Sequence, residues 1–334
     1  MKSQIIDQLI ISSRVRFARN LDSIPFKTTQ QNVFEPISIT IKQKNTGFIS
    51  CRIDQLSDKV AHALYEQHLL SHNILSNKQN GMIVTHEDKE KNRRTCIMLG
   101  EEDHIRIQVI ELGLGLNPAH AIAKKISNDI EKSHKIAHTD ELGYLTSCPT
   151  NLGTAMRASI MMFLPALTKT KQIEKIINNL RGQRITIRGV HGEGSQAVGY
   201  MYQISNQACL GLTEEQIIEK VAEITTKIAN LEIQVQQDIF TSSPDEITDQ
   251  IMRSFGILSH AHMISSDEAT EHLAWLKLGH CLGIIKFKPR VLDDLFFLIQ
   301  PATISTQNER AESPQTRDKI RAKKISTVLR TSRI

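Results

Sequence analysis

The sequence has few cysteines, and their spacing excludes the short motifs that cysteine usually builds. The five cysteines are scattered, and the closest two, Cys51 and Cys96, are 45 positions apart. Without a C-x-x-C pair there is no zinc ribbon or thiol redox motif, and the odd number argues against a disulfide framework. His260 and His262 form an isolated H-x-H pattern, which favours packing or surface histidines. No metal site is therefore predicted.

Long apolar runs and aromatic residues are also scarce. No run approaches the roughly 18 apolar residues of a membrane span, and Asp7, with no small-residue cleavage site nearby, argues against a signal peptide. With 40% hydrophobic and 23% charged residues among 334, the composition predicts a soluble, globular, cytoplasmic protein. Aromatic residues make up 4%, and none follows Phe297. The basic C-terminus therefore lacks the stacking side chains of a nucleic-acid site.

The common phosphate-binding loops are missing as well. The P-loop pattern G-x-x-x-x-G-K-[ST] does not occur. Residues 192–197 fit a loose G-x-G-x-x-A pattern, but strand-like alternation follows where a dinucleotide site needs a helix. The acidic residues about 20 positions later, Glu214 and Glu215, open a helix instead. A dinucleotide site is not favoured.

The net charge of +5 comes from the C-terminus. Residues 309–334 hold eight Lys or Arg and three acidic residues, which leaves 33 basic and 33 acidic residues in the rest of the chain. The basic character therefore says little about the main domain.

Hydrophobic periodicity predicts hairpins mixed with helices. Alternation predicts a strand over 10–17, and two hairpins over 96–110 and 184–204, with a helix near 56–70 and a polar loop at 86–95. Further helices are predicted at 117–137, 155–167, 170–180 and, after the capping box at Thr213, to 238. A linker at 241–245 separates helices at 245–258, 266–280 and 291–300, the last stopped by Pro301. The predicted class is α+β, with domains over 1–238 and 239–334.

Five arginines stand inside otherwise apolar segments: Arg14, Arg16, Arg106, Arg157 and Arg188. Any one of them could be a solvated surface residue, but buried charges need partners. Bidentate guanidinium contacts suit phosphate oxygens, so a triphosphate is the predicted partner. Residues 143–159 add a cysteine, Cys148, among hydroxyl and amide residues ahead of a helix expected to begin near Arg157. That setting lowers a thiol pKa and holds anions.

Two glutamates lie in the turns of the hairpins. Glu102 and Glu193 are suited to hold a cationic acceptor, and one of them to take its proton, if the acceptor is a guanidinium. The Cys148 thiolate would be a third negative partner. The alternative is two solvated turn glutamates and an inert thiol.

At this point the sequence resembles the phosphagen kinase catalytic core (the ATP:guanido phosphotransferases), and most of all its bacterial branch, the McsB-type protein arginine kinases. The resemblance covers about 9–235 and rests on residues 12–20, 101–108, 143–151, 188–195 and 202–207. It implies an antiparallel sheet flanked by helices, with a small C-terminal helical domain. It further implies ATP with Mg²⁺, Glu102 as the main base, Glu193 gripping the guanidinium and Cys148 beside it.

The resemblance also implies a set of nucleotide-binding residues: Ser12, Ser13, Arg14, Val15, Arg16, His68, Arg106, Arg157, Ala158, Ser159, Ile160, Met161, Arg188, Gly189, Val190, His191, Gly192 and Glu193. A second match in the C-terminus, Arg317, Asp318 and Arg321, is similar to the phosphoarginine-binding R-D-x-x-R-A motif of that branch. A basic solvated tail is the alternative for this short match. Family analogy further suggests a homodimer, a zinc-finger activator protein and a Clp-type ATPase or protease.

The acceptor is expected to be an arginine in a protein. Eleven residues precede Ser12, where kinases of free arginine or creatine carry a helical domain that closes over a small substrate. The alternatives are a kinase of a free guanidino compound and a weakly catalytic scaffold that binds phosphoarginine. Three positions depart from the family pattern: Gly100 replaces Asn, Ala155 replaces Gly and His191 replaces an aromatic residue. The first two are expected to alter turn geometry.

Overall fold

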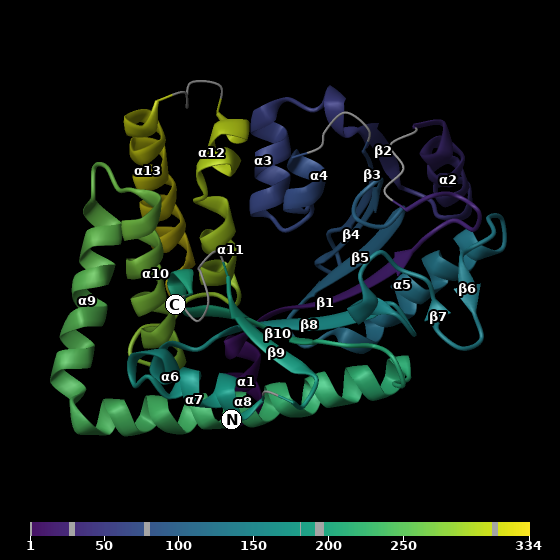
Figure 1. Cartoon of the computed structure of the whole chain (residues 1–334). Coiled ribbons are helices and arrows are strands. Elements are labelled where there is room, and N and C mark those ends of the chain that lie inside the picture. Colours follow the sequence, from purple (N-terminus) through teal and green to yellow (C-terminus); the bar gives the residue numbers. More distant parts are fainter. Residues whose placement is uncertain (1, 27–30, 77–80, 181, 191–196, 309–312) are drawn as a thin grey trace.

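A computed structural model describes residues 2–26, 31–76, 81–180, 182–190, 197–308 and 313–334. Its centre is an eight-stranded sheet in which every neighbouring pair is antiparallel, in the order β2-β3-β4-β5-β1-β8-β10-β9 (Figure 1). The strands are β1 (Ile10–Arg19), β2 (Ile49–Arg52), β3 (Met82–Asp88), β4 (Arg93–Leu99), β5 (Ile105–Leu112), β8 (Met156–Phe163), β9 (Ile185–Gly189) and β10 (Met201–Asn206). A small ribbon pairs β6 (His138–Thr139) with β7 (Gly143–Tyr144). The α+β class and the antiparallel sheet are confirmed.

Helices cover one face of the sheet. α5 packs on β5 and β1, and α8 packs on β8 and β10. The core residues of β1, Val15 and Phe17, alternate with Arg14 and Arg16, which leaves the arginines on the opposite face. The helices up to this point are α1 (Lys2–Leu9), α2 (Gln31–Lys44), α3 (Asp58–Glu66), α4 (His72–Ser76), α5 (Leu116–Glu131), α6 (Pro165–Lys169), α7 (Gln172–Asn179) and α8 (Glu214–Ser242).

A group of five helices follows and stands beside the sheet, at the left of Figure 1. These helices are α9 (Pro244–His260), α10 (Ser266–Cys281), α11 (Val291–Leu298), α12 (Pro301–Gln307) and α13 (Pro314–Ser332). They contact the preceding part of the chain through α3, which packs on α12, and through α10, which packs on the turn before β10. No helix in the described part of the chain has both the length and the apolar composition that crossing a membrane requires.

Several local predictions are confirmed. The strand at 10–17 is β1, and both hairpins form, as β4–β5 and β9–β10. The capping box is present: the Thr213 hydroxyl accepts a 3.2 Å hydrogen bond from the Gln216 N–H, and the Gln216 side chain accepts one of 2.9 Å in return. Strong local signals, such as turn residues and caps, decide these elements.

The helix predicted at 155–167 is wrong, because Met156–Phe163 is strand β8 at the middle of the sheet. Its residues are largely buried on both faces, and periodicity alone does not distinguish such a run from a buried helix. The prediction of a polar loop at 86–95 is also wrong, since most of these residues belong to the β3–β4 hairpin.

Three predictions about the C-terminal part also need correction. The linker at 241–245 is a tight corner at Ser243 between α8 and α9. Pro301 begins α12, in keeping with the preference of proline for the first helical turn. The basic residues after 313 form a packed helix, α13, with Ser313 as its N-cap.

Candidate active site

One face of the sheet gathers arginines from three neighbouring strands. In the β1–β8 register, Arg16 lies directly opposite Arg157, and Arg14 lies opposite Ser159. On the other side of β1, Arg106 of β5 is paired with Ala18, one step along the same face from Arg16. Like charges that face each other across a sheet destabilise it. This arrangement therefore does not stabilise the fold.

Burial and mutual repulsion act on these side chains together. Burial, followed by the neighbouring Arg106 and Arg157, lowers the pKa of Arg14 to about 10. Burial and the same arginine neighbours hold the pKa of Arg16 well below its usual value. Within the described residues, Glu101 is the one carboxylate that forms an ion pair with this cluster, through Arg106. Four guanidiniums thus share one buried carboxylate, which leaves an excess of positive charge.

Neutral groups hold the guanidinium of Arg14 in place. It donates hydrogen bonds to the side-chain oxygens of Gln203 (2.6 Å) and Ser159 (3.4 Å). The buried Nε of Arg16 has no hydrogen-bond partner among the described residues. Neutral partners fix the direction of a charge without cancelling it, so the cluster is suited to bind an anion.

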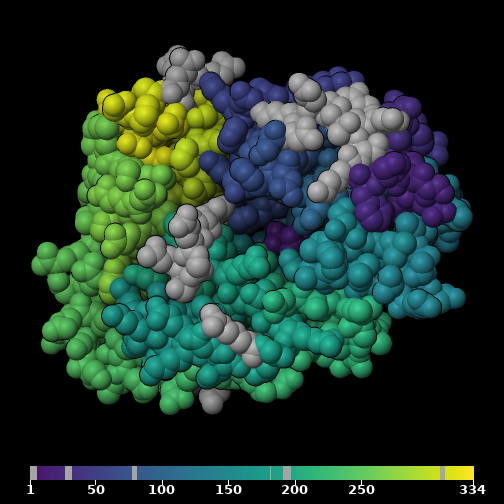
Figure 2. Space-filling model, in the orientation of Figure 1, coloured from purple at the N-terminus to yellow at the C-terminus, as the bar shows by residue number. Residues whose placement is uncertain are grey.

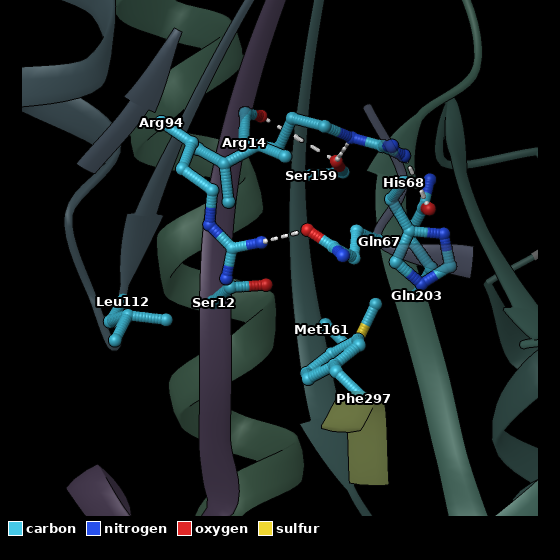
Figure 3. Close-up of a pocket in the computed structure, with 11 residues that line it drawn as sticks. Ser12, Arg14, Gln67, His68, Arg94, Leu112, Ser159, Met161, Gln203 and Phe297 are labelled. Atoms are coloured by element: carbon cyan, nitrogen blue, oxygen red, sulfur yellow. Dashed lines mark hydrogen bonds between the residues drawn. The ribbon is translucent and has the colours of Figure 1, made fainter. Parts of the chain in front are cut away.

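A pocket opens beside this cluster, lined by Ser12, Arg14, Gln67, His68, Arg94, Ile110, Leu112, Ser159, Met161, Gln203 and Phe297 (Figure 3). Figure 2 shows the surface hollowed near its centre, with dark purple N-terminal residues visible between blue and teal ones. The pocket contains five residues of the predicted nucleotide set: Ser12, Arg14, His68, Ser159 and Met161. The structure therefore brings residues of β1, β8 and the end of α3 together around one pocket.

The turn at Glu102 and the loop at Cys148 are tied to each other. The Ser147 hydroxyl donates a 2.8 Å hydrogen bond to the Glu102 carbonyl, and the Cys148 thiol lies 3.1 Å from the Thr150 hydroxyl. Burial lowers the pKa of Arg157, and the neighbouring Arg188 and Arg106 lower it further. The carboxylate of Glu102 forms no hydrogen bond within the part of the chain that the structure describes, so it is available to a substrate.

Other predicted residues lie elsewhere. Strand alternation turns four side chains into the core, where they cannot touch a ligand on the arginine face: Ser13, Val15, Ala158 and Ile160. Arg188 lies exposed on β9 and is followed by Gly189 and then Val190, which is half-buried. His191, Gly192 and Glu193 lie outside the described residues.

Sequence reasoning missed three residues that the structure places at the site. Glu101 is buried and bonds to Arg106 and to the Ser71 hydroxyl. Gln203 fixes Arg14, and its position within the 202–207 motif was the only signal for it. Phe297 reaches the pocket from α11, 94 positions beyond Gln203, and no local pattern indicated it.

The C-terminal motif lies on α13. Asp318 and Arg321 form an ion pair, and the buried Arg321 side chain also donates to the backbone carbonyls of Ile299 and Ile264, at 2.8 Å each. Arg317 is half-buried one turn away. Arg321 therefore fastens α13 to the neighbouring helices, and phosphoarginine binding by this motif stays a prediction.

Two family models match the chain. The C-terminal catalytic domain of ATP:guanido phosphotransferases matches residues 29–235, and the C-terminal domain of the protein-arginine kinase McsB matches residues 244–333. Among curated relatives, the protein-arginine kinase of Caldanaerobacter subterraneus subsp. tengcongensis is 38% identical over 96% of this chain and 97% of its own. The protein-arginine kinase of Bacillus subtilis is 36% identical over 94% of this chain and 88% of its own.

Solved structures share the fold. A lombricine kinase superposes with a TM-score of 0.55 at 23% identity, over 68% of this chain and 66% of its own. The duplicated taurocyamine kinase from Schistosoma mansoni, with bound transition state analog components, gives a TM-score of 0.59 at 21% identity, over 89% of this chain and 46% of its own. At these identities the likeness concerns the fold alone.

Proposed function

The chain belongs to the ATP:guanido phosphotransferase family, in its protein-arginine kinase branch, and on that basis we propose that it transfers the γ-phosphoryl group of ATP to arginine side chains of proteins. The observation that carries the proposal is the half-buried cluster of Arg14, Arg16, Arg106 and Arg157 around one buried carboxylate. A triphosphate matches such an excess of fixed positive charge, because in the transition state its negative charge is spread over the oxygens of the transferring phosphoryl group and the leaving ADP.

The acceptor side of the reaction is assigned to Glu102, Cys148 and Glu193. A guanidinium is a poor nucleophile until it loses a proton, so Glu102 takes that proton as a guanidino nitrogen attacks the γ-phosphorus. The N–P bond forms, the bond from the γ-phosphorus to the bridging oxygen breaks, and ADP leaves. Cys148 serves as a negative partner of the guanidinium and not as a nucleophile. Glu193 is proposed to grip the same group.

The donor chemistry of the face fits a metal ion that is carried by the nucleotide. The described side chains are mostly guanidiniums, which bind phosphate and not metal. Mg²⁺ usually takes one or two carboxylates plus phosphate oxygens and keeps several waters. We therefore assign Mg²⁺ to the ATP phosphates, where it neutralises their charge.

A protein acceptor is favoured by the relatives named protein-arginine kinases, which match nearly the whole chain. We also propose, by analogy with that branch, a cytoplasmic homodimer, a zinc-finger activator protein and a Clp-type protease that receives the marked proteins. Recognition of phosphoarginine by Arg317, Asp318 and Arg321 would provide feedback from the product.

The experiment compares acceptors. Purified protein with Mg-ATP is supplied either with an unrelated folded protein or with free arginine, and ADP release is measured together with phosphoarginine, under handling that avoids acid because the N–P bond is acid-labile. The proposal expects phosphoarginine on the protein and slow turnover with free arginine. Rapid turnover with free arginine alone would assign a small-guanidino kinase instead. Binding of phosphoarginine proteins without ATP turnover would assign a scaffold.

A further inference from the structure

The nucleotide pocket is completed by a residue from the C-terminal helices. We propose that Phe297, on α11, binds the base of the nucleotide, so that the helical part supplies one wall of a site whose other residues come from the sheet and the end of α3. The inference rests on the proposed function, because it takes the ligand to be a nucleoside triphosphate.

The pocket has two chemically different ends, as Figure 3 shows. At one end, Arg14 reaches toward Ser159 and Gln203, next to the arginine cluster. At the other end, Met161 and Phe297 lie together, and the register places Met161 opposite Ser12, two residues along β1 from Arg14. Phosphates belong at the guanidinium end and the base at the apolar end, because a base gains most from contact with aromatic and thioether groups.

Phe297 lies at the edge of the core and lines the pocket. Its ring is half-buried and meets the ring of His68 edge-on, with centroids 5.9 Å apart and an interplanar angle of 85°. The preceding residue, Phe296, is buried and lies close to Gly199, just before β10. Both phenylalanines line a neighbouring cavity, but of the two only Phe297 lines the pocket beside Arg14.

Two contacts hold α11 in place, one to the sheet and one to the end of α3. At its start, Arg290 donates a 3.2 Å hydrogen bond to the Ile11 carbonyl of β1 and lies so close to Gly113 that a Cβ there would be 2.4 Å from a guanidinium nitrogen. Just beyond its end, the Glu66 carboxylate accepts hydrogen bonds from the N–H groups of Ala302 (2.8 Å) and Thr303 (2.7 Å), at the start of α12.

The second contact, made by Glu66, involves a residue that directly precedes two pocket residues in the sequence. Glu66 is the last residue of α3, and the next two residues, Gln67 and His68, both line the pocket. A carboxylate at a helix N-terminus is a favourable contact. The wall that carries Phe297 is therefore anchored at both ends, next to the strand and the helix that form the rest of the site.

The test compares a ligand that has a base with one that lacks it. Titration calorimetry of the full chain with Mg-ATP and with inorganic tripolyphosphate is performed on the wild type, F297A, F297Y and a surface control, F26A. F297A is expected to weaken ATP roughly tenfold and to leave tripolyphosphate unchanged. F297Y, which keeps an aromatic ring, and F26A are expected to bind both ligands like the wild type. GTP is expected to weaken as ATP does in F297A, because stacking does not read the base.

Two results would overturn the inference: unchanged ATP affinity in F297A, or equal weakening of ATP and tripolyphosphate, which would mean that the helices had merely shifted. The proposed function fails separately, if the wild type binds ATP with the Phe297 dependence described here but transfers no phosphoryl group to arginine. A wild type that binds no ATP would overturn both.

Discussion

The carboxylate of Asp103 accepts a 2.7 Å hydrogen bond from the backbone N–H of Ser147. Asp103 is buried and also accepts one of 2.7 Å from the side chain of Asn20, which in turn accepts from the His104 N–H. Together with the bond from the Ser147 hydroxyl to the Glu102 carbonyl, these contacts join the turn that carries the proposed base to the loop that carries Cys148.

Asp103 is therefore predicted to position the acceptor side of the site. Asp103→Asn places an amide against the Ser147 N–H and is expected to lower kcat about 100-fold, as small displacements of catalytic groups do, with the KM for ATP unchanged. Ser147→Ala removes a single hydrogen bond and should lower kcat less. Steady-state ADP release at varied ATP measures both, with the exposed Asp140→Asn as control. A raised KM for ATP at unchanged kcat would refute this role.

The cross-strand pair of Arg16 and Arg157 is predicted to lower the stability of the protein without ligand and to strengthen the binding of ATP. Arg16→Leu removes a buried charge that faces a like charge, so the free energy of unfolding without ligand should rise by about 1 kcal/mol. The increase in Tm that Mg-ATP produces should disappear, because a phosphate contact is lost. Calorimetry with and without Mg-ATP measures both quantities. The exposed Arg330→Leu serves as control and should change neither. A less stable Arg16→Leu protein would contradict the electrostatic argument.

Ala155 occupies a backbone conformation that favours glycine. Its φ is +50°, and it is buried just before β8, where its carbonyl accepts a 3.0 Å hydrogen bond from the Ala18 N–H. Ala155→Gly is expected to stabilise the protein by about 1 kcal/mol in denaturant unfolding, since left-handed φ is costly for residues with a Cβ. Ala222→Gly, within α8, should destabilise by roughly the same amount. Equal losses at the two positions would mean that no strain is present at Ala155.

Glu232 predicts a dependence of stability on pH. Its buried carboxylate accepts hydrogen bonds from the N–H groups of Ala166 (2.8 Å) and Leu167 (2.9 Å), yet burial outweighs these and raises its pKa to about 7. A raised pKa in the folded state means that the folded protein binds the proton more tightly. The resulting stabilisation is complete below the unfolded pKa of 4.5 and is lost as pH rises through about 7.

The measurement is the free energy of unfolding of the wild type and of Glu232→Gln at several pH values between about 4.5 and 8. The wild type should lose on the order of 3 kcal/mol over this range relative to the variant, whose side chain does not titrate. Parallel curves for the two proteins would show that the folded carboxylate has an ordinary pKa.

Local signals in the sequence predicted most of the fold. The alternation that separates Val15 from Arg14 and the capping box at Thr213 each depend on neighbouring residues, and each produced the predicted element. The helix prediction failed at β8 because the residues of this strand are buried on both faces by elements distant in sequence. Its Met and Ala residues also favour helices intrinsically, so tertiary pairing with β1 and β10 overrides propensity there.

The site follows the same division. The arginines were predictable, because a charged residue inside an apolar strand needs a partner for its charge, and the neighbouring residues in the sequence do not provide one. Their partners were not. Asn20 meets Asp103 across 83 positions, and Phe297 meets His68 from the far end of the chain. Neither pairing leaves a periodic or compositional trace, and both depend on how the sheet and the C-terminal helices dock.

The central claim is that the arginine cluster and Glu102 together move a phosphoryl group onto arginine. The most direct measurement is mass spectrometry of a folded acceptor protein after incubation with Mg-ATP, with neutral handling throughout, for the wild type and for Glu102→Ala. The account predicts phosphoarginine with the wild type and only background with Glu102→Ala, which still binds ATP. Phosphate on serine, threonine or histidine alone, or equal phosphoarginine with both proteins, would contradict it.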